Sequence, residues 1–421
     1  MGQFLNIKQF LRSPFRGRLS QEHQEALIQL TKVFPFKVSR YVLEELIDWS
    51  EYDRDPIYRL VFPRREMLRP EHWELLRSAQ TVQAEKAAVF EIRKALNPHP
   101  DGQLQNVPLF QGQPLEGIQH KYRETVLFFP KQGQTCHSFC TYCFRWAQFV
   151  NTEAGKFRSN DREQLAAYLQ GHPEVTDLLL TGGDPMFMNN QWLFHYLDIL
   201  NRPELAHVRH IRIGTKALAY FPHRFLGEEG QALLSGLNAF VRSGKHVTIM
   251  AHFSHPRELS TPTVQQAIQA IRQHGIEIRT QAPLVRGIND EASIWAKMWK
   301  LQVRLGMIPY YMFVERDTGA HHYFSVPLAR AYHIFTEAYS RVSGLVKTVR
   351  GPSMSHTTGK VLVDGILEWG GEKFFLLKYL QARQPSWINR PFLARYDEKA
   401  TWLDELDILP NALFQSAEAS Q

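Results

Sequence analysis

Short apolar runs alternate along the middle of the chain with stretches of helical periodicity. The runs are rich in aliphatic and β-branched residues and lie at 125–130, 177–183, 210–217, 246–253, 277–287 and 307–315. Between them, apolar positions recur every three or four residues at 162–170, 190–201, 229–243, 261–274 and 291–305. Strands that alternate with helices at this spacing predict a parallel sheet with crossover helices, as in a doubly wound sheet or an incomplete barrel.

The two ends of the chain have different patterns. Residues 20–32 and 70–96 read as amphipathic helices, and 97–119 is rich in proline and glycine, which is typical of a linker. The last segment, 361–421, contains tryptophan and proline and ends in a polar tail. We therefore expect three parts, namely an N-terminal helical region and linker over 1–119, an α/β core over 120–320 and a C-terminal segment over 321–421.

Side chains that can bind ligands follow the predicted strands. In parallel α/β folds the chemistry lies at the carboxyl ends of the strands, where the loops converge. The residues at these ends are three cysteines after the first strand, Gly182, Gly183 and Asp184 after the second, His252 and His255 after the fourth, Arg286 after the fifth and Arg316 after the sixth.

Composition and charge narrow the class of protein. The 421 residues are 44% hydrophobic, enough for a large core. No apolar run approaches the ~18–20 residues of a membrane helix, and residues 1–18 lack the apolar centre of a secretory signal, so we expect a cytoplasmic protein with no membrane partner. The net charge of +7 comes from scattered residues, which favours a mildly basic surface with some anion-binding arginines over nucleic-acid binding.

The three cysteines are the most informative feature of the composition. Cys136, Cys140 and Cys143 lie within eight residues and are the only cysteines, which excludes a disulfide framework and fits a reducing compartment. Structural zinc takes four ligands, and His137 is poorly placed as a fourth because it adjoins Cys136. Iron–sulfur clusters also normally take four thiolates. Three thiolates on a [4Fe–4S] cluster would leave one iron open to a small molecule, which indicates a chemical role.

Several motifs resemble those of one enzyme superfamily. The stretch 135–145, TCHSFCTYCFR, resembles the CxxxCxxC motif of radical S-adenosylmethionine (SAM) enzymes, and LTGGDP at 180–185 resembles their glycine-rich motif. Further segments, at 34–41, 55–57, 251–258, 281–290 and 309–311, narrow the resemblance to the lysine 2,3-aminomutase family. This resemblance implies a partial (β/α)6 TIM-type barrel, a [4Fe–4S] cluster on Cys136, Cys140 and Cys143, and SAM on the open iron.

The same resemblance implies roles for other residues. Gly182, Gly183 and Asp184 would hold the amino group of SAM, with His252 and Gln281 lining the same mouth. Arg145 would bind the substrate carboxylate, since a guanidinium fork suits that group. Lys360 would bind pyridoxal 5′-phosphate (PLP) as an imine, although its preceding loop is three residues longer than in the family. In the family, two arginines bind the phosphate of PLP. The matching positions in this chain hold Lys121 and Thr125, and the nearby Arg123 lies two residues before the second position.

Two further positions bear on the substrate. In the family, two aspartates bind the distal ammonium of lysine. The matching positions in this chain hold Arg316 and Arg350, whose positive charges would repel that ammonium. The substrate expected from these arginines carries at least two anionic groups, unless Asp317 replaces Arg316 through a one-residue shift. The zinc-binding cysteines of the family are absent, because no cysteine follows Cys143.

We therefore expect a radical SAM enzyme, an isomerase of the PLP-dependent aminomutase type that acts on a substrate other than free lysine. The alternatives are a PLP-independent radical SAM enzyme of another reaction type, a non-catalytic iron–sulfur protein and, from net charge alone, an enzyme that modifies nucleic acid. The expected partners are an acidic, amino-acid-like substrate, an electron donor such as flavodoxin or ferredoxin, and a second copy of the chain in a homo-oligomer.

Overall fold

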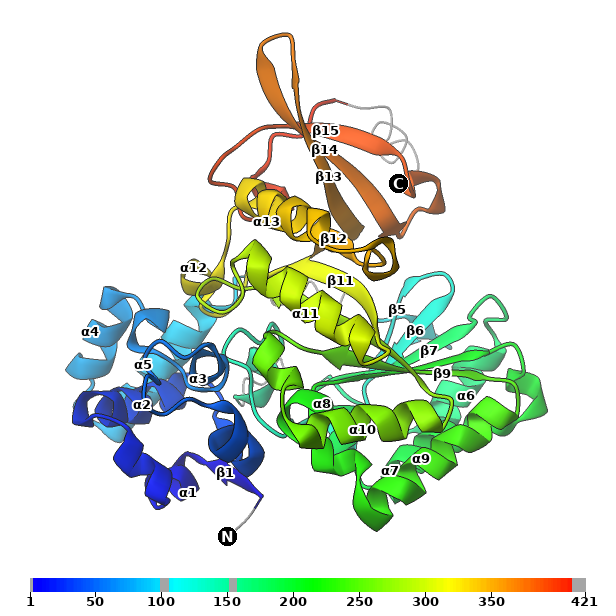
Figure 1. Ribbon diagram of the computed structural model, residues 1–421, viewed down its shortest axis with the longest axis horizontal. Helices are drawn as coiled ribbons and strands as arrows, with labels where there is room; N and C mark the ends of the chain where they lie inside the picture. Colours follow the sequence, from blue (N-terminus) through cyan, green and yellow to red (C-terminus); the bar gives the residue numbers. More distant parts are fainter. Residues whose placement is uncertain (1–2, 99–105, 151–156, 411–421) are drawn as a thin grey trace.

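The computed structural model describes residues 3–98, 106–150 and 157–410 (Figure 1). Its centre is an 11-stranded sheet in which the strand order runs from β5 to β15 without interruption. Parallel pairing joins seven neighbouring strands. These strands are β6 (Thr125–Phe128), β7 (Asp177–Leu180), β8 (His210–Thr215), β9 (His246–His252), β10 (Glu277–Leu284), β11 (Ile308–Val314) and β12 (Arg350–Ser355).

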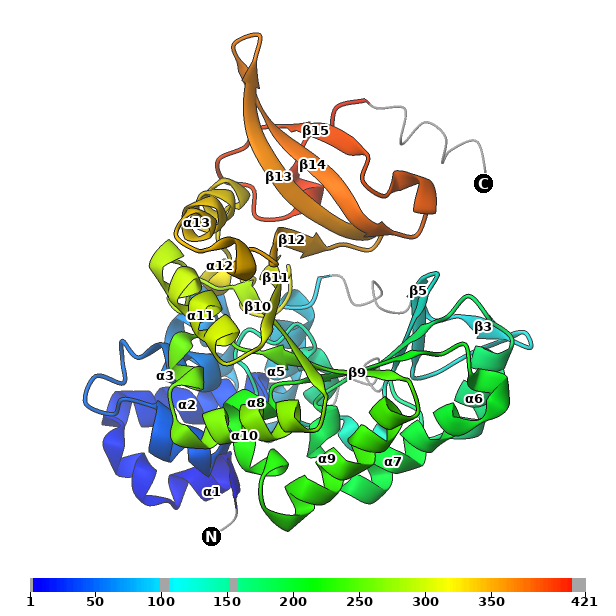
Figure 2. The same ribbon diagram turned by 45° about the vertical axis from the view of Figure 1, so that its right-hand side comes forward.

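Crossover helices connect the parallel strands, and all the predicted strands and crossover helices of the core are confirmed. The main helices are α6 (Arg162–Gln170), α7 (Asn190–Leu197), α9 (Gly227–Arg242), α10 (Pro262–Gln273), α11 (Ala292–Arg304) and α13 (Leu328–Ser340). Two short helices, α8 (Ala217–Tyr220) and α12 (His321–Phe324), follow β8 and β11. Helices α6, α7, α9 and α10 lie together on one side of the strands (Figure 2).

The topology distinguishes the two architectures that the sequence left open. Neighbouring strands of the sheet are consecutive in the chain, whereas a doubly wound sheet reverses its strand order at a switch point. The sheet also curls, so that its edge strand β5 approaches the strands that follow β12. Lys121 of β5 (Ile118–Tyr122) donates hydrogen bonds to the carbonyls of His356 and Gly359, beside the start of β13 (Gly359–Trp369). The core is therefore the predicted partial (β/α)6 barrel.

Local signals explain where these elements begin. The side chains of Asp161, Asn189 and Thr261 accept hydrogen bonds from the first turns of α6, α7 and α10, and Pro262 occupies the first position of α10. Strand β9 is buried at five consecutive positions, as expected of a central parallel strand covered on both faces.

Helices precede the barrel, as predicted. They are α1 (Ile7–Leu11), α2 (Gln21–Val33), α3 (Pro56–Val61), α4 (Pro70–Ser78) and α5 (Val82–Ala95), together with the paired strands β1 (Phe4–Asn6) and β2 (Lys37–Ser39). The single helix expected over 70–96 is two helices, because Thr81 caps a new one. The expected linker contains a hairpin of β3 (Leu109–Phe110) and β4 (Gln113–Pro114), while its residues 99–105 lie outside the described residues.

The C-terminal segment extends the sheet. Strands β13, β14 (Glu372–Ala382) and β15 (Pro391–Arg395) pair antiparallel beside β12. The sequence analysis did not predict this extension, and the polar tail that it noted falls outside the described residues. No helix in the described part of the chain is long and apolar enough to cross a membrane.

Candidate active site

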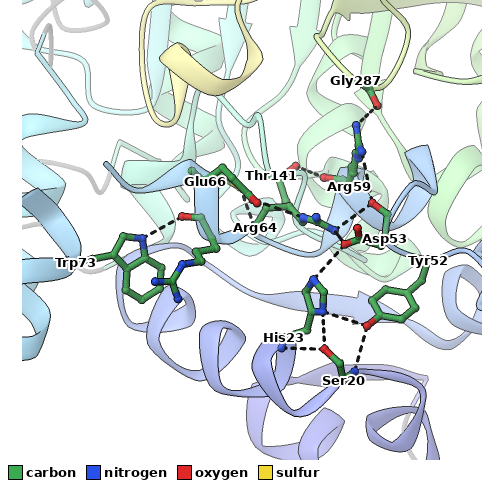
Figure 3. A network of polar contacts seen from close by, with 12 residues as sticks. Ser20, His23, Tyr52, Asp53, Arg59, Arg64, Glu66, Trp73, Thr141 and Gly287 are labelled. Carbon is green, nitrogen blue, oxygen red and sulfur yellow. Dashed lines mark hydrogen bonds and ion pairs between the residues drawn. The ribbon is translucent and has the colours of Figure 1, made fainter. Parts of the chain in front are cut away.

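The three cysteines lie in the loop after β6, which the N-terminal region holds in place. All three are partly buried free thiols. The backbone N–H of Phe139 donates to the carbonyl of Lys37 at 2.9 Å, and the hydroxyl of Thr141 donates to the carbonyl of Arg59 at 2.6 Å. Figure 3 shows Arg59 between Thr141 and the carbonyl of Gly287, to which its guanidinium donates. The cysteine loop is therefore fixed by elements from outside the barrel.

The surroundings of the thiols disfavour their ionised form unless a cation is bound nearby. Burial raises the pKa of all three, and the charge of Cys140 adds to the rise of Cys143 to about 12. The pKa of Cys136 is raised by burial, then by Asp184 and by the other two thiols. Thiols in such a setting lose their protons when a nearby cation compensates for the charge, as a bound metal does.

The three thiols offer the ligands that a cluster needs. All three lie in one loop and none forms a disulfide. An iron–sulfur cluster takes each thiolate on a separate iron. Over residues 3–98, 106–150 and 157–410, no three His, Cys, Asp or Glu side chains converge where one metal ion would bind.

The glycine-rich loop after β7 packs directly on the start of the cysteine loop. Gly182 has φ of 131°, and a Cβ on it would lie 2.2 Å from the side-chain nitrogen of Gln134. A Cβ on Gly183 would lie 2.4 Å from the backbone nitrogen of Thr135. Because backbone cannot move aside as a side chain can, Gly183 is required for this contact. These glycines seat the cysteine loop against the second strand.

Asp184 faces the protein interior. Its side chain is 2% exposed and accepts hydrogen bonds from the hydroxyl of Thr215 at 2.6 Å and from the backbone N–H groups of Met186 and Lys216, each at 3.0 Å. One oxygen also lies 3.6 Å from Nδ1 of His137. The carboxylate thus joins the ends of β7 and β8, and its predicted role toward the amino group of SAM stays a prediction.

We expect Asp184→Asn to lower the free energy of unfolding by about 2–4 kcal/mol, because its amide N–H₂ would face buried donors. Thermal denaturation would measure the loss, with the exposed Asp198→Asn as the matched control. A variant of normal stability that has lost SAM affinity would instead mean that the carboxylate contacts the ligand.

His252 and Gln281 are brought together as predicted. They are register partners on β9 and β10, and their side-chain nitrogens form a hydrogen bond of 2.7 Å. Burial, followed by the charge of Lys216, lowers the pKa of His252 to about 4, so its ring is neutral near pH 7. Lys216, at the end of β8, forms an ion pair of 2.7 Å with the fully buried Glu258. This pair was not predicted from the sequence, although Lys216 directly follows a strand, as the predicted ligand-binding residues do.

Lys360 lies inside the barrel against aromatic rings. It is on β13, and its ammonium lies 3.9 Å from the ring centre of Tyr311 and 5.3 Å from that of Phe313. Among the described residues it has no hydrogen-bond acceptor and no carboxylate partner. Burial, followed by the charges of Arg212, Arg350 and Lys121, lowers its pKa well below the usual value. The lowered pKa makes the amine of Lys360 more readily available as a nucleophile than that of an exposed lysine.

Three arginines named from the sequence lie around the same interior. Arg145 is 8% exposed, and Arg145 and Arg316 both contact the ring of Phe144, at 4.9 and 5.6 Å. Arg350 of β12 lies 4.4 Å from the ring of Tyr311, which Lys360 also contacts. The positive charge of Arg145 lowers the pKa of Cys143, and the charge of Arg316 lowers the pKa of Arg145. Arg145 is therefore close both to the cysteine loop and to another of these cations.

The remaining predicted positions are not part of this group. Arg123 is exposed at the turn between β5 and β6, and Thr125 is buried at the first residue of β6. Of the positions matched to phosphate-binding arginines, only Lys121 contacts the interior, where burial and the charges of Arg316 and Arg383 lower its pKa to about 7.

A cavity of about 690 Å³ opens beside the barrel, between the N-terminal helices and the C-terminal segment. Asp317 lines it together with His321 and Asp404, while Arg316 does not. The two adjacent residues therefore face different spaces.

Comparisons with known proteins agree with these observations. No family model matches the chain. It is 29% identical, over 95% of both chains, to a protein of Aquifex aeolicus (strain VF5) named "Putative L-lysine 2,3-aminomutase". It is 30% identical to L-lysine 2,3-aminomutase of Escherichia coli (strain K12), over 56% of this chain and 67% of that one.

A solved structure of a radical SAM methyltransferase from Sphaerobacter thermophilus is a more distant match. It is 16% identical with a TM-score of 0.38, over 56% of this chain and 68% of that one, which is too remote to inform the fold. The two sequence relatives carry the assignment, together with the cysteine and glycine loops at the ends of the first two barrel strands. The chain therefore belongs to the lysine 2,3-aminomutase family of radical SAM enzymes.

Proposed function

We propose that this protein is a PLP-dependent amino acid aminomutase that uses a [4Fe–4S] cluster and SAM and acts on a substrate other than free lysine. The observation that carries the proposal is the amine of Lys360, desolvated on Tyr311 and ringed by cations, in a barrel whose first loop holds three buried thiols. In the family, the cluster and SAM supply a 5′-deoxyadenosyl radical, and PLP holds the amino group that moves to the neighbouring carbon.

Each of the three groups, the cluster, SAM and PLP, would be held by different residues of the chain. Cys136, Cys140 and Cys143 would ligate the cluster, and the loop of Gly182 and Gly183 would hold SAM. Lys360 would hold PLP through its amine, since its lowered pKa favours the free amine over the ammonium. Lys121 would face the phosphate, and the buried guanidinium of Arg145 would hold the substrate carboxylate.

Two features support a substrate other than lysine. Arg316 and Arg350 occupy positions at which a cationic substrate end would meet like charge. In the described part of the chain, neither guanidinium forms an ion pair with a carboxylate that could offset that repulsion.

The test is anaerobic reconstitution with iron, sulfide, SAM and PLP, followed by a screen of amino acids for 5′-deoxyadenosine release. We expect release that depends on the amino acid, together with a visible PLP band. Amino-acid-dependent release without any PLP band would favour a PLP-independent radical SAM enzyme. A stable cluster without SAM cleavage would favour a non-catalytic iron–sulfur protein.

A further inference from the structure

Five basic side chains surround the interior of the barrel. They are Lys121, Arg145, Arg316, Arg350 and Lys360, which act on one another through their charges. Over the described residues none of the five forms an ion pair with a carboxylate. Unpaired cations in a partly desolvated space are costly, so a site built this way is completed by anions that arrive with its ligands.

Two of these cations carry unsatisfied buried donors. Nη1 of Arg145 and Nε of Arg316 are both buried and have no hydrogen-bond partner. The two guanidiniums share the ring of Phe144, and the charge of Arg316 helps to lower the pKa of Arg145 to about 10, after burial. Both groups remain charged near pH 7. An α-carboxylate satisfies Arg145 only, so a second anion is needed for Arg316.

The acidic neighbours of Arg316 offset its burial only in part: the charges of Asp317 and Glu315 raise its pKa, but burial outweighs them. Glu315 is buried and hydrogen-bonded to Nδ1 of His321 at 2.8 Å, and burial raises its pKa to about 7. Asp317 lines the separate cavity of about 690 Å³. The chain bends after β11 so that Arg316, and not Asp317, faces Arg145 and Lys121.

Resting on the proposed function, we infer that Arg316 binds an anionic group at the distal end of the substrate, so that the substrate is an acidic amino acid. The distal group is a carboxylate or a phosphate, since a guanidinium fork recognises both. Arg316 is then a residue that determines specificity, and Arg145 keeps the α-carboxylate.

The first experiment needs no variant. PLP-loaded, cluster-reconstituted protein without SAM is titrated with glutamate, aspartate, phosphoserine, glutamine and lysine, and the change in the PLP absorption band gives each Kd. We expect glutamate to bind roughly 10- to 100-fold more tightly than its neutral isostere glutamine, the scale of one charged hydrogen bond. Tightest binding of phosphoserine would identify the distal anion as a phosphate.

Variants then assign the preference to one side chain. Arg316→Gln should remove most of the preference for glutamate over glutamine, Arg316→Lys should keep part of it, and Arg316→Asp should improve the binding of lysine. Arg330→Gln, on the exposed surface of α13, is the control with the same change of charge. Equal binding of glutamate and glutamine by the wild type would overturn the inference and leave the proposed function intact. Efficient turnover of free lysine would overturn the inference and also the exclusion of lysine as substrate, while leaving the aminomutase activity standing. If no amino acid perturbs the PLP band or releases 5′-deoxyadenosine, the proposed function fails, and this inference with it.

Discussion

Replacing any one of Cys136, Cys140 and Cys143 with alanine should abolish the [4Fe–4S] absorption spectrum and SAM cleavage. The chain has no other cysteine that could substitute for the missing thiolate. Loss of one ligand also leaves the remaining buried thiols without the cation that stabilises their ionised form. Iron content, the visible spectrum and 5′-deoxyadenosine release would measure the effect after anaerobic reconstitution.

Tyr220→Phe is a suitable control for the cysteine variants. Its hydroxyl lies 3.3 Å from Sγ of Cys140, so the substitution alters the surroundings of a thiol while keeping every thiol in place. This variant should retain its iron. A cysteine variant that cleaves SAM at the wild-type rate would refute the assignment of the cluster to this loop.

Lys360→Ala should abolish the PLP absorption band without lowering thermal stability. The ammonium of Lys360 contacts only aromatic rings and is surrounded by other cations, so its removal takes away a desolvated charge rather than a stabilising contact. Burial and the neighbouring cations lower the pKa of Lys360, so its free amine forms at a lower pH than that of an exposed lysine. The rate of PLP loading by the wild type should therefore reach its plateau at a lower pH than the rate for an exposed lysine.

Lys378→Ala is the matched control for this experiment. Lys378 lies on the neighbouring strand β14, where it forms an ion pair of 2.9 Å with Asp364. Its loss should leave the PLP band unchanged. An undiminished band in Lys360→Ala would move the PLP-binding lysine elsewhere or favour the PLP-independent alternative.

The barrel was predictable from the sequence because its signals are local. Each of the apolar runs at 177–183 and 246–253 is a buried strand, and the polar residues that follow lie at the carboxyl ends. The C-terminal strands also had a local signal, in the alternating residues on either side of Gly370 and Gly371, which have positive φ in the hairpin turn between β13 and β14. The tryptophan and proline content of the segment obscures that signal.

The orientation of polar side chains could not be predicted in the same way. Asp184 ends a strand, as a ligand-binding residue does, but its hydrogen-bond donors Thr215 and Lys216 belong to the next strand of the sheet. The different directions of Arg316 and Asp317 likewise depend on how the chain bends after β11. These contacts are tertiary, and no spacing along the chain encodes them.

The attachment of the cysteine loop to the N-terminal region determines how the protein can be dissected. Three backbone and side-chain hydrogen bonds join Phe139 and Thr141 to β2 and α3, and the ammonium of Lys37 donates to Thr135 at 2.6 Å. A fragment that began at the barrel would keep every thiol but lose one wall around them. Oxygen and chelators would then reach the loop from a side that the intact chain covers. The N-terminal helices are thus a protective layer for an oxidisable centre rather than an appendage to it.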